Sequence, residues 1–261
     1  MTQQLVIDHV SKVFGGLKAV ADVTMTIEQG TLIALIGPNG AGKTTLFNML
    51  TGESGPSSGT ITLYTADGPV DITKKKAYQV AKLGVARTFQ NIRLFGAMTV
   101  KENVLVARTH LYRESFIGTM LRLPQFYQQE AAVATAADEL LDFFELADVA
   151  DEPTASLPYG TQRRVEIVRA VATKPQLLFL DEPVAGMNPE ETADLGRLIT
   201  RIREHFGITV VLIEHDMSLV MKLAESIYVL DHGAMIASGT PNEIQTNAQV
   251  ISAYLGGENH A

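Results

Sequence analysis

The chain has 261 residues, 46% of them hydrophobic and 19% charged, so it can bury a substantial core. A net charge of −8 leaves no basic surplus for non-specific nucleic-acid binding, and the absence of cysteine excludes disulfides, thiolate metal sites and cysteine nucleophiles. Residues 1–5 lack the features of a secretory signal, and no apolar run reaches the roughly 18 residues of a spanning helix. We therefore expect a soluble chain that reaches a membrane only through other proteins.

The first third of the chain predicts strands around one conspicuous loop. Residues 5–14 and 60–64 have the pattern of antiparallel strands, and the Gly/Ser/Pro cluster at 52–59 predicts a loop. Between them, residues 32–36 form an apolar run typical of a buried parallel strand. The glycine-rich residues 37–45 follow, and the helical pattern of residues 46–50 comes next. This order is strand, loop, helix.

Residues 37–45, hereafter the phosphate loop, have the spacing G-x-x-x-x-G-K-T. Gly40 and Gly42 permit backbone angles and close approach to phosphate oxygens that a Cβ would forbid. Lys43 supplies a positive charge to the β- and γ-phosphates, and the Thr44 hydroxyl is placed to bind Mg²⁺. The alternative is a glycine-rich turn that happens to end in Lys-Thr, and the flanking strand and helix argue against it.

The middle of the chain has a helical sequence pattern instead of strand patterns. Residues 100–146 are rich in helix formers with helical spacing, which predicts a helical subdomain inserted into an α/β core. Within it, residues 111–129 are amphipathic and carry several aromatic side chains. Ordinary packing of a helical hairpin explains this pattern, and a docking surface for a partner is the alternative.

Three further apolar runs, at residues 177–180, 209–213 and 227–230, predict parallel strands. The first ends in Asp181 and Glu182, whose charges are costly at the end of a buried strand unless a cation is near. Asp181 therefore fits a Mg²⁺ ligand, and Glu182 fits the base that orients the attacking water. A helix-capping acid pair is the alternative. His215 follows the second run at the same expected sheet edge and can reach the γ-phosphate, although a lone histidine is more often structural.

These motifs, in this order over nearly the whole chain, resemble those of the ATP-binding cassette (ABC) family. The resemblance implies that Gln90 bridges Mg²⁺, water and a membrane subunit, that residues 185–189 form the D-loop, and that His215 is the switch histidine. Phe14 stands where the family stacks an aromatic ring on adenine, with a core aromatic as the alternative.

The family's signature segment aligns with residues 157–164, but Leu-Ser-Gly-Gly-Gln is replaced by Leu157-Pro-Tyr-Gly-Thr161. The resemblance implies that this helix start faces the ATP of another subunit in a head-to-tail dimer. Pro158 is tolerated at a helix start, although the serine hydroxyl is missing. The departure is similar to one ATPase subtype of bacterial branched-chain amino acid importers, as are residues 111–129, 234–244 and 253–256.

The resemblance also sets the expected partners and location. Such importers combine two different ATPases, two integral membrane permeases and a periplasmic or lipid-anchored solute-binding protein, with the ATPases peripheral on the cytoplasmic face of the inner membrane. The resemblance therefore implies an ATP-binding and ATP-hydrolysing subunit that energises uptake of branched-chain amino acids. Urea, short amides or another amino acid is the alternative cargo, because the ATPase does not touch it. A soluble ABC protein of DNA repair or translation is a more distant alternative, since the chain has one cassette and no long heptad insertion.

The expected fold is α/β: a P-loop NTPase (RecA-like) core with a mainly parallel sheet, an antiparallel β subdomain and an inserted α-helical subdomain. Residues 1–90 and 166–240 would form the core, 91–165 the helical signature subdomain and 241–261 a helical tail, together one ABC ATPase domain. The expected cofactors are ATP and Mg²⁺, with Glu182, His215 and Gln90 catalytic and Thr44, Gln90 and Asp181 on the metal. The expected ATP contacts are Phe14, Gly37, Asn39, Gly40, Ala41, Gly42, Lys43, Thr44, Thr45, Tyr159, Gly160 and Thr161.

Overall fold

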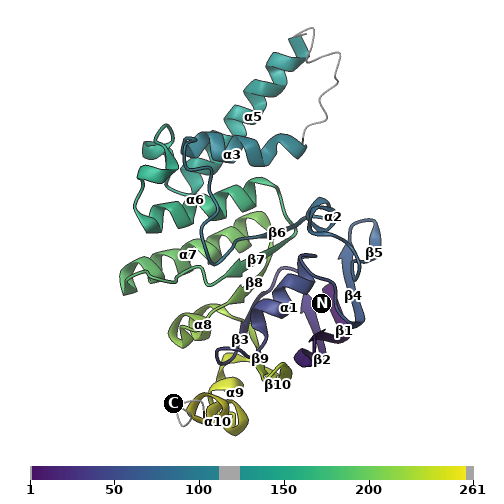
Figure 1. The fold of residues 1–261 in the computed structure, drawn as a ribbon. Coiled ribbons are helices and arrows are strands. Elements are labelled where there is room, and N and C mark those ends of the chain that lie inside the picture. The colour runs from purple at the N-terminus through teal and green to yellow at the C-terminus, as the bar shows by residue number, and fades with distance from the viewer. Residues whose placement is uncertain (1, 112–123, 257–261) are drawn as a thin grey trace. The chain divides into compact units, whose positions relative to one another are not determined.

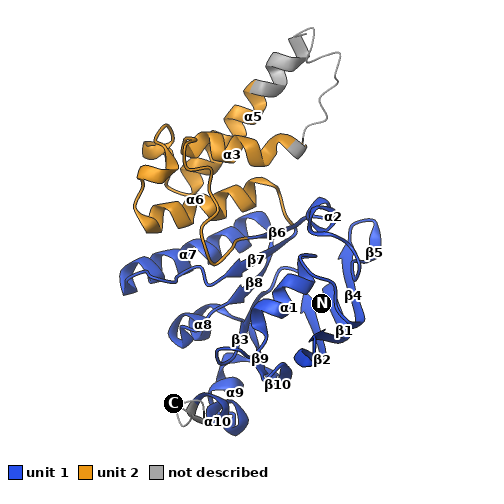
Figure 2. Ribbon diagram, viewed as in Figure 1, with its two compact units in different colours: residues 1–87, 176–261 blue, residues 88–175 orange. Residues whose placement is uncertain are grey.

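The computed structural model describes residues 2–111 and 124–256 (Figure 1). The chain forms two compact units, drawn in different colours in Figure 2: unit 1 comprises residues 1–87 and 176–261, and unit 2 comprises residues 88–175. The amphipathic segment 111–129 lies mainly outside the described residues, so neither interpretation of it is tested. Among the described residues, no helix has both the length and the apolar character needed to cross a bilayer.

Unit 1 contains two sheets. The antiparallel sheet has the order β2-β1-β4-β5, and its strands are β1 (Gln3–Phe14), β2 (Leu17–Glu28), β4 (Ser58–Thr65) and β5 (Gly68–Asp71). The other sheet has the order β10-β9-β3-β8-β7-β6, and its strands are β3 (Leu32–Ile36), β6 (Val85–Arg87), β7 (Leu177–Asp181), β8 (Thr209–Ile213), β9 (Ser226–Asp231) and β10 (Ala234–Gly239). Only β10 pairs antiparallel in that sheet, as far as the described residues show. The predicted α/β fold with a mainly parallel sheet is confirmed.

The register of the parallel strands sets where the chemistry lies. Ile213 in β8 pairs with Leu35 in β3 on one side and with Asp181 in β7 on the other. The carboxyl ends of these three strands therefore meet at one edge, and the residues that follow each strand emerge together. The phosphate loop follows β3, Glu182 follows β7, and His215 comes two residues after β8 ends.

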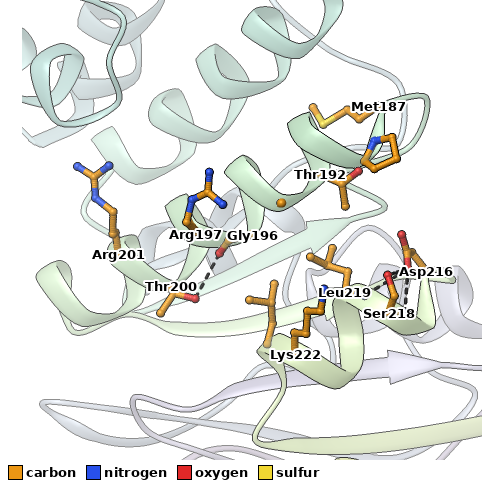
Figure 3. A pocket seen from close by; sticks show the side chains of 13 residues that line it. Met187, Thr192, Gly196, Arg197, Thr200, Arg201, Asp216, Ser218, Leu219 and Lys222 are labelled. Carbon is orange, nitrogen blue, oxygen red and sulfur yellow. Dashed lines mark hydrogen bonds between the residues drawn. The ribbon is translucent and has the colours of Figure 1, made fainter.

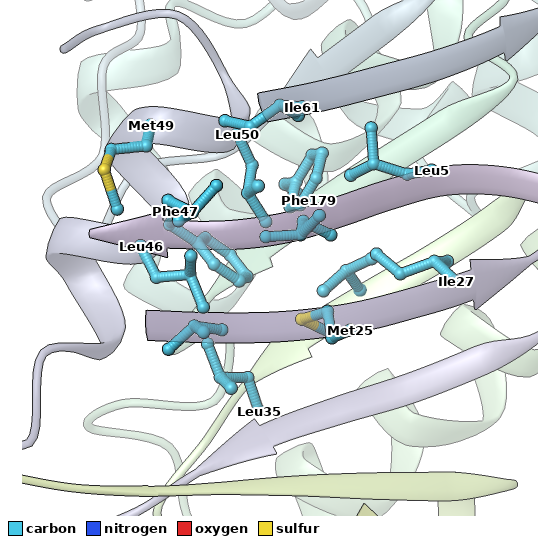
Figure 4. Packing of buried hydrophobic residues seen from close by; sticks show 14 of the residues in the cluster. Leu5, Met25, Ile27, Leu35, Leu46, Phe47, Met49, Leu50, Ile61 and Phe179 are labelled. Atoms are coloured by element: carbon cyan, nitrogen blue, oxygen red, sulfur yellow. The ribbon is translucent and has the colours of Figure 1, made fainter. Parts of the chain in front are cut away.

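The helices of unit 1 flank these sheets. They are α1 (Lys43–Leu50), α2 (Ala77–Lys82), α7 (Pro189–Phe206), α8 (Met217–Leu223), α9 (Pro241–Gln245) and α10 (Ala248–Gly256). Figure 4 shows the core into which α1 packs, between side chains of the two sheets. Phe47 of α1 and Phe179 of β7 meet edge to face with ring centroids 5.0 Å apart, and both are fully buried. Burying such a side chain contributes about 1.5–3 kcal/mol, so α1, which starts at the phosphate loop, is held firmly.

Unit 2 is helical in the residues described. It contains α3 (Val100–Arg108), α5 (Pro124–Phe143) and α6 (Tyr159–Ala172), with short 3₁₀ turns η1 (Thr109–Leu111), η2 (Ala147–Val149) and η3 (Thr154–Ser156). A capping box starts α3, in which Thr99 and Glu102 each accept a hydrogen bond from the other's backbone N–H. The predicted helical insertion is confirmed.

Candidate nucleotide-binding site

The phosphate loop joins β3 to α1 in a conformation that favours glycine at three positions. Gly37 has φ 149°, Gly40 has φ 78° and Gly42 has φ 97°. A Cβ on Gly37 would lie 2.0 Å from the Leu230 carbonyl oxygen, and one on Gly42 would lie 2.4 Å from that of Ala19. Both positions therefore exclude a side chain. Because α1 begins at Lys43, the N–H groups of its first turn can receive an anion at the loop.

Lys43 is held inside the loop by backbone oxygens. Its Nζ donates to the carbonyls of Gly37 at 2.8 Å and Pro38 at 3.0 Å, and the side chain is buried. Burial lowers the pKa of Lys43, and the nearby carboxylates of Glu182 and Asp181 partly offset this shift. The charge of Lys43 therefore interacts with both carboxylates. Asn39 and Thr44 of the same loop are exposed, whereas Ala41 is buried.

Asp181 has a partner that the sequence did not indicate. Arg87, at the end of β6, donates to Asp181 Oδ2 at 2.7 Å, and both side chains are buried. The same guanidinium donates to Asn48 Oδ1 at 2.6 Å and Thr51 Oγ1 at 3.2 Å. Arg87 thus compensates the buried charge of Asp181 and ties it to α1. Sequence spacing could not reveal a pair 94 residues apart.

Glu182 and His215 lie together at the strand ends. Nδ1 of His215 lies 4.0 Å from Oε1 of Glu182, and the histidine side chain is largely exposed. Glu182 has a positive φ of 45°, and its N–H donates to the carbonyl of Ile213 at 3.0 Å. A non-glycine residue in that region is uncommon and costs about 1–3 kcal/mol, so the surrounding structure fixes this turn. The helix-capping alternative for Asp181 and Glu182 is not observed, because α7 is capped by Asn188.

Glu214 fixes the backbone next to Glu182 and His215. Its carboxylate is fully buried and accepts hydrogen bonds from the N–H groups of Val184 at 3.1 Å and His215 at 3.2 Å. Burial raises the pKa of Glu214, and these two N–H donors act in the opposite direction. Asp216 then caps α8 by accepting from the N–H groups of Ser218 and Leu219. The backbone on both sides of His215 is therefore fixed by carboxylates, which leaves the imidazole to face solvent.

Phe14 ends β1 and is 52% exposed, with the Lys12 ammonium 5.1 Å from its ring centroid. The alternative of a core aromatic is therefore wrong. The β1–β2 hairpin that carries Phe14 also brings Ala19 against Gly42, so the aromatic side chain lies on a hairpin in contact with the phosphate loop.

Gln90 and the signature segment belong to unit 2. Arg163 of α6, the helix that starts with the signature segment, forms hydrogen bonds to the segment that carries Gln90. Arg163 donates to the carbonyls of Phe89 at 2.6 Å and Gln90 at 2.8 Å. Glu166, which Arg163 also contacts at 2.7 Å, accepts from the N–H of Phe89 at 3.3 Å. Gln90 itself is exposed. The sequence missed Arg163 and Glu166, although two charged residues three apart in an otherwise apolar helix face could have indicated a buried pair.

The altered signature segment forms the start of α6. Pro158 occupies the N-cap position and makes no side-chain capping hydrogen bond. Tyr159 is 45% exposed, and its hydroxyl accepts from Arg163 at 3.2 Å. Gly160 and Thr161 lie in the first turn, so their backbone N–H groups are among those that an α-helix leaves without an internal partner.

A groove of about 760 Å³ lies between α7 and α8, just beyond Asp216 (Figure 3). Its walls include the cationic side chains of Arg197, Arg201 and Lys222. No residue predicted from the sequence to contact ATP or metal lines it. The groove is therefore separate from the candidate site.

A strand, a glycine loop with a buried lysine, and a strand ending in an acid pair at the same sheet edge define a P-loop nucleotide-binding protein. The sequence profile of the family described as "ABC transporter" matches residues 20–185, and that of "Branched-chain amino acid ATP-binding cassette transporter" matches residues 234–260. The chain belongs to the ABC transporter family and is one of its ATP-hydrolysing ATP-binding cassettes.

Individual relatives agree with this assignment. The chain is 45% identical to the high-affinity branched-chain amino acid transport ATP-binding proteins LivG of Salmonella typhimurium and BraF of Pseudomonas aeruginosa, over 93% of this chain and 94% of each relative. Among solved structures, an ATP-binding cassette in its ADP conformation is 30% identical, covering 98% of this chain and 100% of its own, with a TM-score of 0.83. A nucleotide-free cassette is 29% identical, covering 97% and 99%, with a TM-score of 0.81.

Proposed function

We propose that this chain is the ATPase of an importer for branched-chain amino acids. The observation that carries the ATPase role is the meeting of Lys43, Asp181, Glu182 and His215 at one edge of the parallel sheet. The proposed cargo is supported by relatives that are 45% identical and are named for branched-chain amino acid transport. It is also supported by the match of residues 234–260 to the branched-chain family profile.

ATP would lie with its phosphates on the phosphate loop. Lys43 would move its hydrogen bonds from the Gly37 and Pro38 carbonyls to the β- and γ-phosphate oxygens, and Phe14 would stack on adenine. Mg²⁺ prefers oxygen ligands, and we expect that the Thr44 hydroxyl, the Asp181 carboxylate and the Gln90 amide oxygen would supply them. The metal, when bound, neutralises charge on the phosphates.

Glu182 would accept the proton of the attacking water, and His215, whose Nδ1 lies 4.0 Å from Oε1 of Glu182, would orient that water from the adjoining strand end. Water oxygen then bonds to the γ-phosphorus, and the bond between that phosphorus and the β,γ-bridging oxygen breaks. The products are ADP and phosphate. The strained backbone at Glu182 supports this role, because such strain is retained where a side chain must be aimed.

The other half of each ATP site would come from a second, non-identical ATPase subunit in a head-to-tail dimer. The exposed start of α6, with Tyr159, Gly160 and Thr161, would face that subunit's ATP. Exposed Gln90 would contact one of two permeases, so that the chain is held on the cytoplasmic face of the inner membrane. A solute-binding protein would deliver cargo to the permeases.

The test is co-purification from membranes followed by reconstitution with the permeases recovered. We expect two permeases and a second ATPase, and ATP-dependent uptake of leucine, isoleucine or valine into vesicles. Uptake of urea, amides or another amino acid, with none of these three, would refute the cargo. Recovery with ribosomes or DNA in place of permeases would refute the transport role.

A further inference from the structure

The stretch between β5 and α3 has a charge opposite to that of the whole chain. Residues 72–101 contain seven lysines and arginines and no aspartate or glutamate, although acids outnumber lysines and arginines by 29 to 21 in the full sequence. Four of the seven are lysines of unit 1 in and just before α2 (Figure 1). These lysines and one tyrosine of α2 are called the basic patch below: Lys74, Lys75, Lys76, Tyr78 and Lys82.

Helix α2 directs Tyr78 and Lys82 away from the core. Val80 is 1% exposed and packs at Gly52, where an added Cβ would lie 2.8 Å from Val80 Cγ2. At about 100° per residue, Tyr78 and Lys82 each lie roughly 160° around the helix from Val80. Tyr78 is accordingly 60% exposed, and Nζ of Lys82 lies 5.9 Å from the centroid of its ring. An aromatic ring and a cation therefore share the solvent face of α2.

The start of α2 does not require a lysine. Lys76 occupies the N-cap position, where a side-chain oxygen is usually favoured, and its ammonium cannot accept a capping hydrogen bond. The side chain of Gln79 accepts a hydrogen bond from the Lys76 N–H at 2.9 Å instead. Three adjacent cations ahead of a helix repel one another and oppose its dipole. The run of three lysines therefore costs the fold some stability, which favours a role outside the fold.

The lysines of the basic patch are available to a partner. Among the described residues, the one salt bridge made by a lysine joins Lys101 to Asp138, outside the patch. Asp71 is the acid that precedes the patch, and its carboxylate accepts a hydrogen bond from the Thr73 N–H at 2.8 Å. Hydrogen bonds from Thr73 lower the pKa of Asp71, and the charges of Lys75 and Lys74 contribute less. Most of the positive charge of the patch is therefore not neutralised within the chain.

We propose that the basic patch is a contact surface for anionic lipid headgroups. Anionic lipids of a cytoplasmic leaflet attract lysines, each of which raises partitioning about 5-fold, and a tyrosine ring is favoured at headgroup level. Seven residues separate Lys82 from Gln90, the proposed permease contact, so the patch is closely connected to that segment. The inference rests on the proposed function for the position of the chain at a membrane, and it is independent of cargo.

The test is sedimentation of the full chain with vesicles that contain about 30% phosphatidylglycerol in phosphatidylcholine, compared with vesicles of phosphatidylcholine alone. At about 0.1 M salt, the Debye length of about 10 Å screens acids elsewhere on the chain. We expect binding to the anionic vesicles only. The triple variant Lys74→Gln/Lys75→Gln/Lys76→Gln should bind them about 30- to 100-fold more weakly. Tyr78→Ala should lower binding a few-fold and leave its salt dependence unchanged.

The matched control removes three cations from the groove between α7 and α8: Arg197→Gln/Arg201→Gln/Lys222→Gln. It changes the net charge by the same amount and should bind anionic vesicles within about two-fold of the parent. Thermal unfolding checks that both triple variants are folded. Equal losses in the two triple variants would overturn the inference, because the charge of the whole chain would then be responsible. Failure of the parent to bind anionic vesicles would also overturn it.

A membrane pull-down separates lipid from protein as the partner of the basic patch. If the lysine variant of the patch loses the permeases but binds vesicles as the parent does, the patch contacts a protein and the inference is wrong. The proposed function fails by a different result, which is recovery of the parent chain without permeases. Vesicle binding contains no permease, so its outcome leaves the test of the proposed function unchanged.

Discussion

Arg163 donates a hydrogen bond to Glu166 across 2.7 Å in a side-chain pair that is 0% and 2% exposed. Between them, the two side chains hold the backbone of Phe89, Gln90 and Arg93. The helix that begins with the altered signature segment is therefore fixed to the segment that carries Gln90. Within unit 2, a displacement of one entails a displacement of the other.

Replacing Arg163 tests this connection. Arg163→Met leaves the Glu166 charge buried without its partner, so we expect the free energy of unfolding to fall by about 3–5 kcal/mol. Hydrogen exchange of residues 88–93 should also accelerate. Arg164→Met is the matched control on the same helix, since its pair with Glu145 is partly exposed and should contribute about 1 kcal/mol or less. Equal losses in the two variants would contradict the buried-pair account.

The pair formed by Arg87 and Asp181 predicts strong coupling between their substitutions. Arg87→Met should destabilise unit 1 by about 3–5 kcal/mol, because a buried carboxylate loses its partner. In the double variant Arg87→Met/Asp181→Asn, the carboxylate charge is absent, so the loss should be well below the sum of the single losses. Urea unfolding of the four proteins of this cycle measures the coupling. Additive losses would show that the two charges do not compensate each other.

Glu182→Gln should separate hydrolysis from binding. The amide keeps the shape of the side chain but cannot accept the proton of water, so hydrolysis in the assembled complex should fall about 10²- to 10⁴-fold. Nucleotide affinity should stay within a few-fold of the parent. Glu204→Gln, an exposed acid on α7, is the control. A normal turnover rate in Glu182→Gln would remove Glu182 from the role of base.

Glu214 gives the protein a specific pH dependence. Because burial raises its pKa above the ordinary 4.5, the folded state binds its proton more tightly than the unfolded state does. Its contribution to stability is therefore greatest below the unfolded pKa and is lost as pH rises through the folded pKa. The stability of the parent relative to Glu214→Gln should decrease from about pH 4 to pH 8, as measured by urea unfolding at each pH. A difference that is constant or grows with pH would contradict this.

The signature segment predicts two unequal ATP sites in the assembled transporter. The site that contains Pro158 of this chain lacks the usual serine hydroxyl and should hydrolyse more slowly than the other. Pro158→Ser should add a capping hydrogen bond to α6, worth about 1 kcal/mol, and should raise the rate at that site. Inactivating each site separately measures both rates. Equal rates in the parent complex would rule the idea out.

Local patterns predicted the central strands well. The apolar runs at Leu32–Ile36 and Thr209–Ile213 match β3 and β8 residue for residue, because strands buried on both faces must be continuously apolar. The expected loop at 52–59 is shorter, since β4 begins at Ser58. Strand β2 was missed, although the alternation of buried Val23, Met25 and Ile27 with more exposed residues is itself the pattern of a half-buried strand. Short β6 was missed because only its pairing with β7 defines it.

The residues of the candidate site also differ in whether a local sequence pattern predicts them. The phosphate loop, Asp181, Glu182 and His215 are predictable because each stands in a local strand-end motif. Arg87 and Arg163 are not, because their partners Asp181 and Phe89 lie 94 and 74 positions away in the chain. Such pairings exist only after the chain has folded, and no pattern within either segment encodes them.

The contacts of Arg163 have one further property. The guanidinium donates hydrogen bonds to the backbone carbonyl oxygens of Phe89 and Gln90, and every residue type has this oxygen. The hydrogen bonds between α6 and this segment therefore do not depend on which side chains residues 89 and 90 carry. The side chains at residues 89 and 90 could therefore be substituted while the hydrogen bonds from Arg163 to the backbone stay the same.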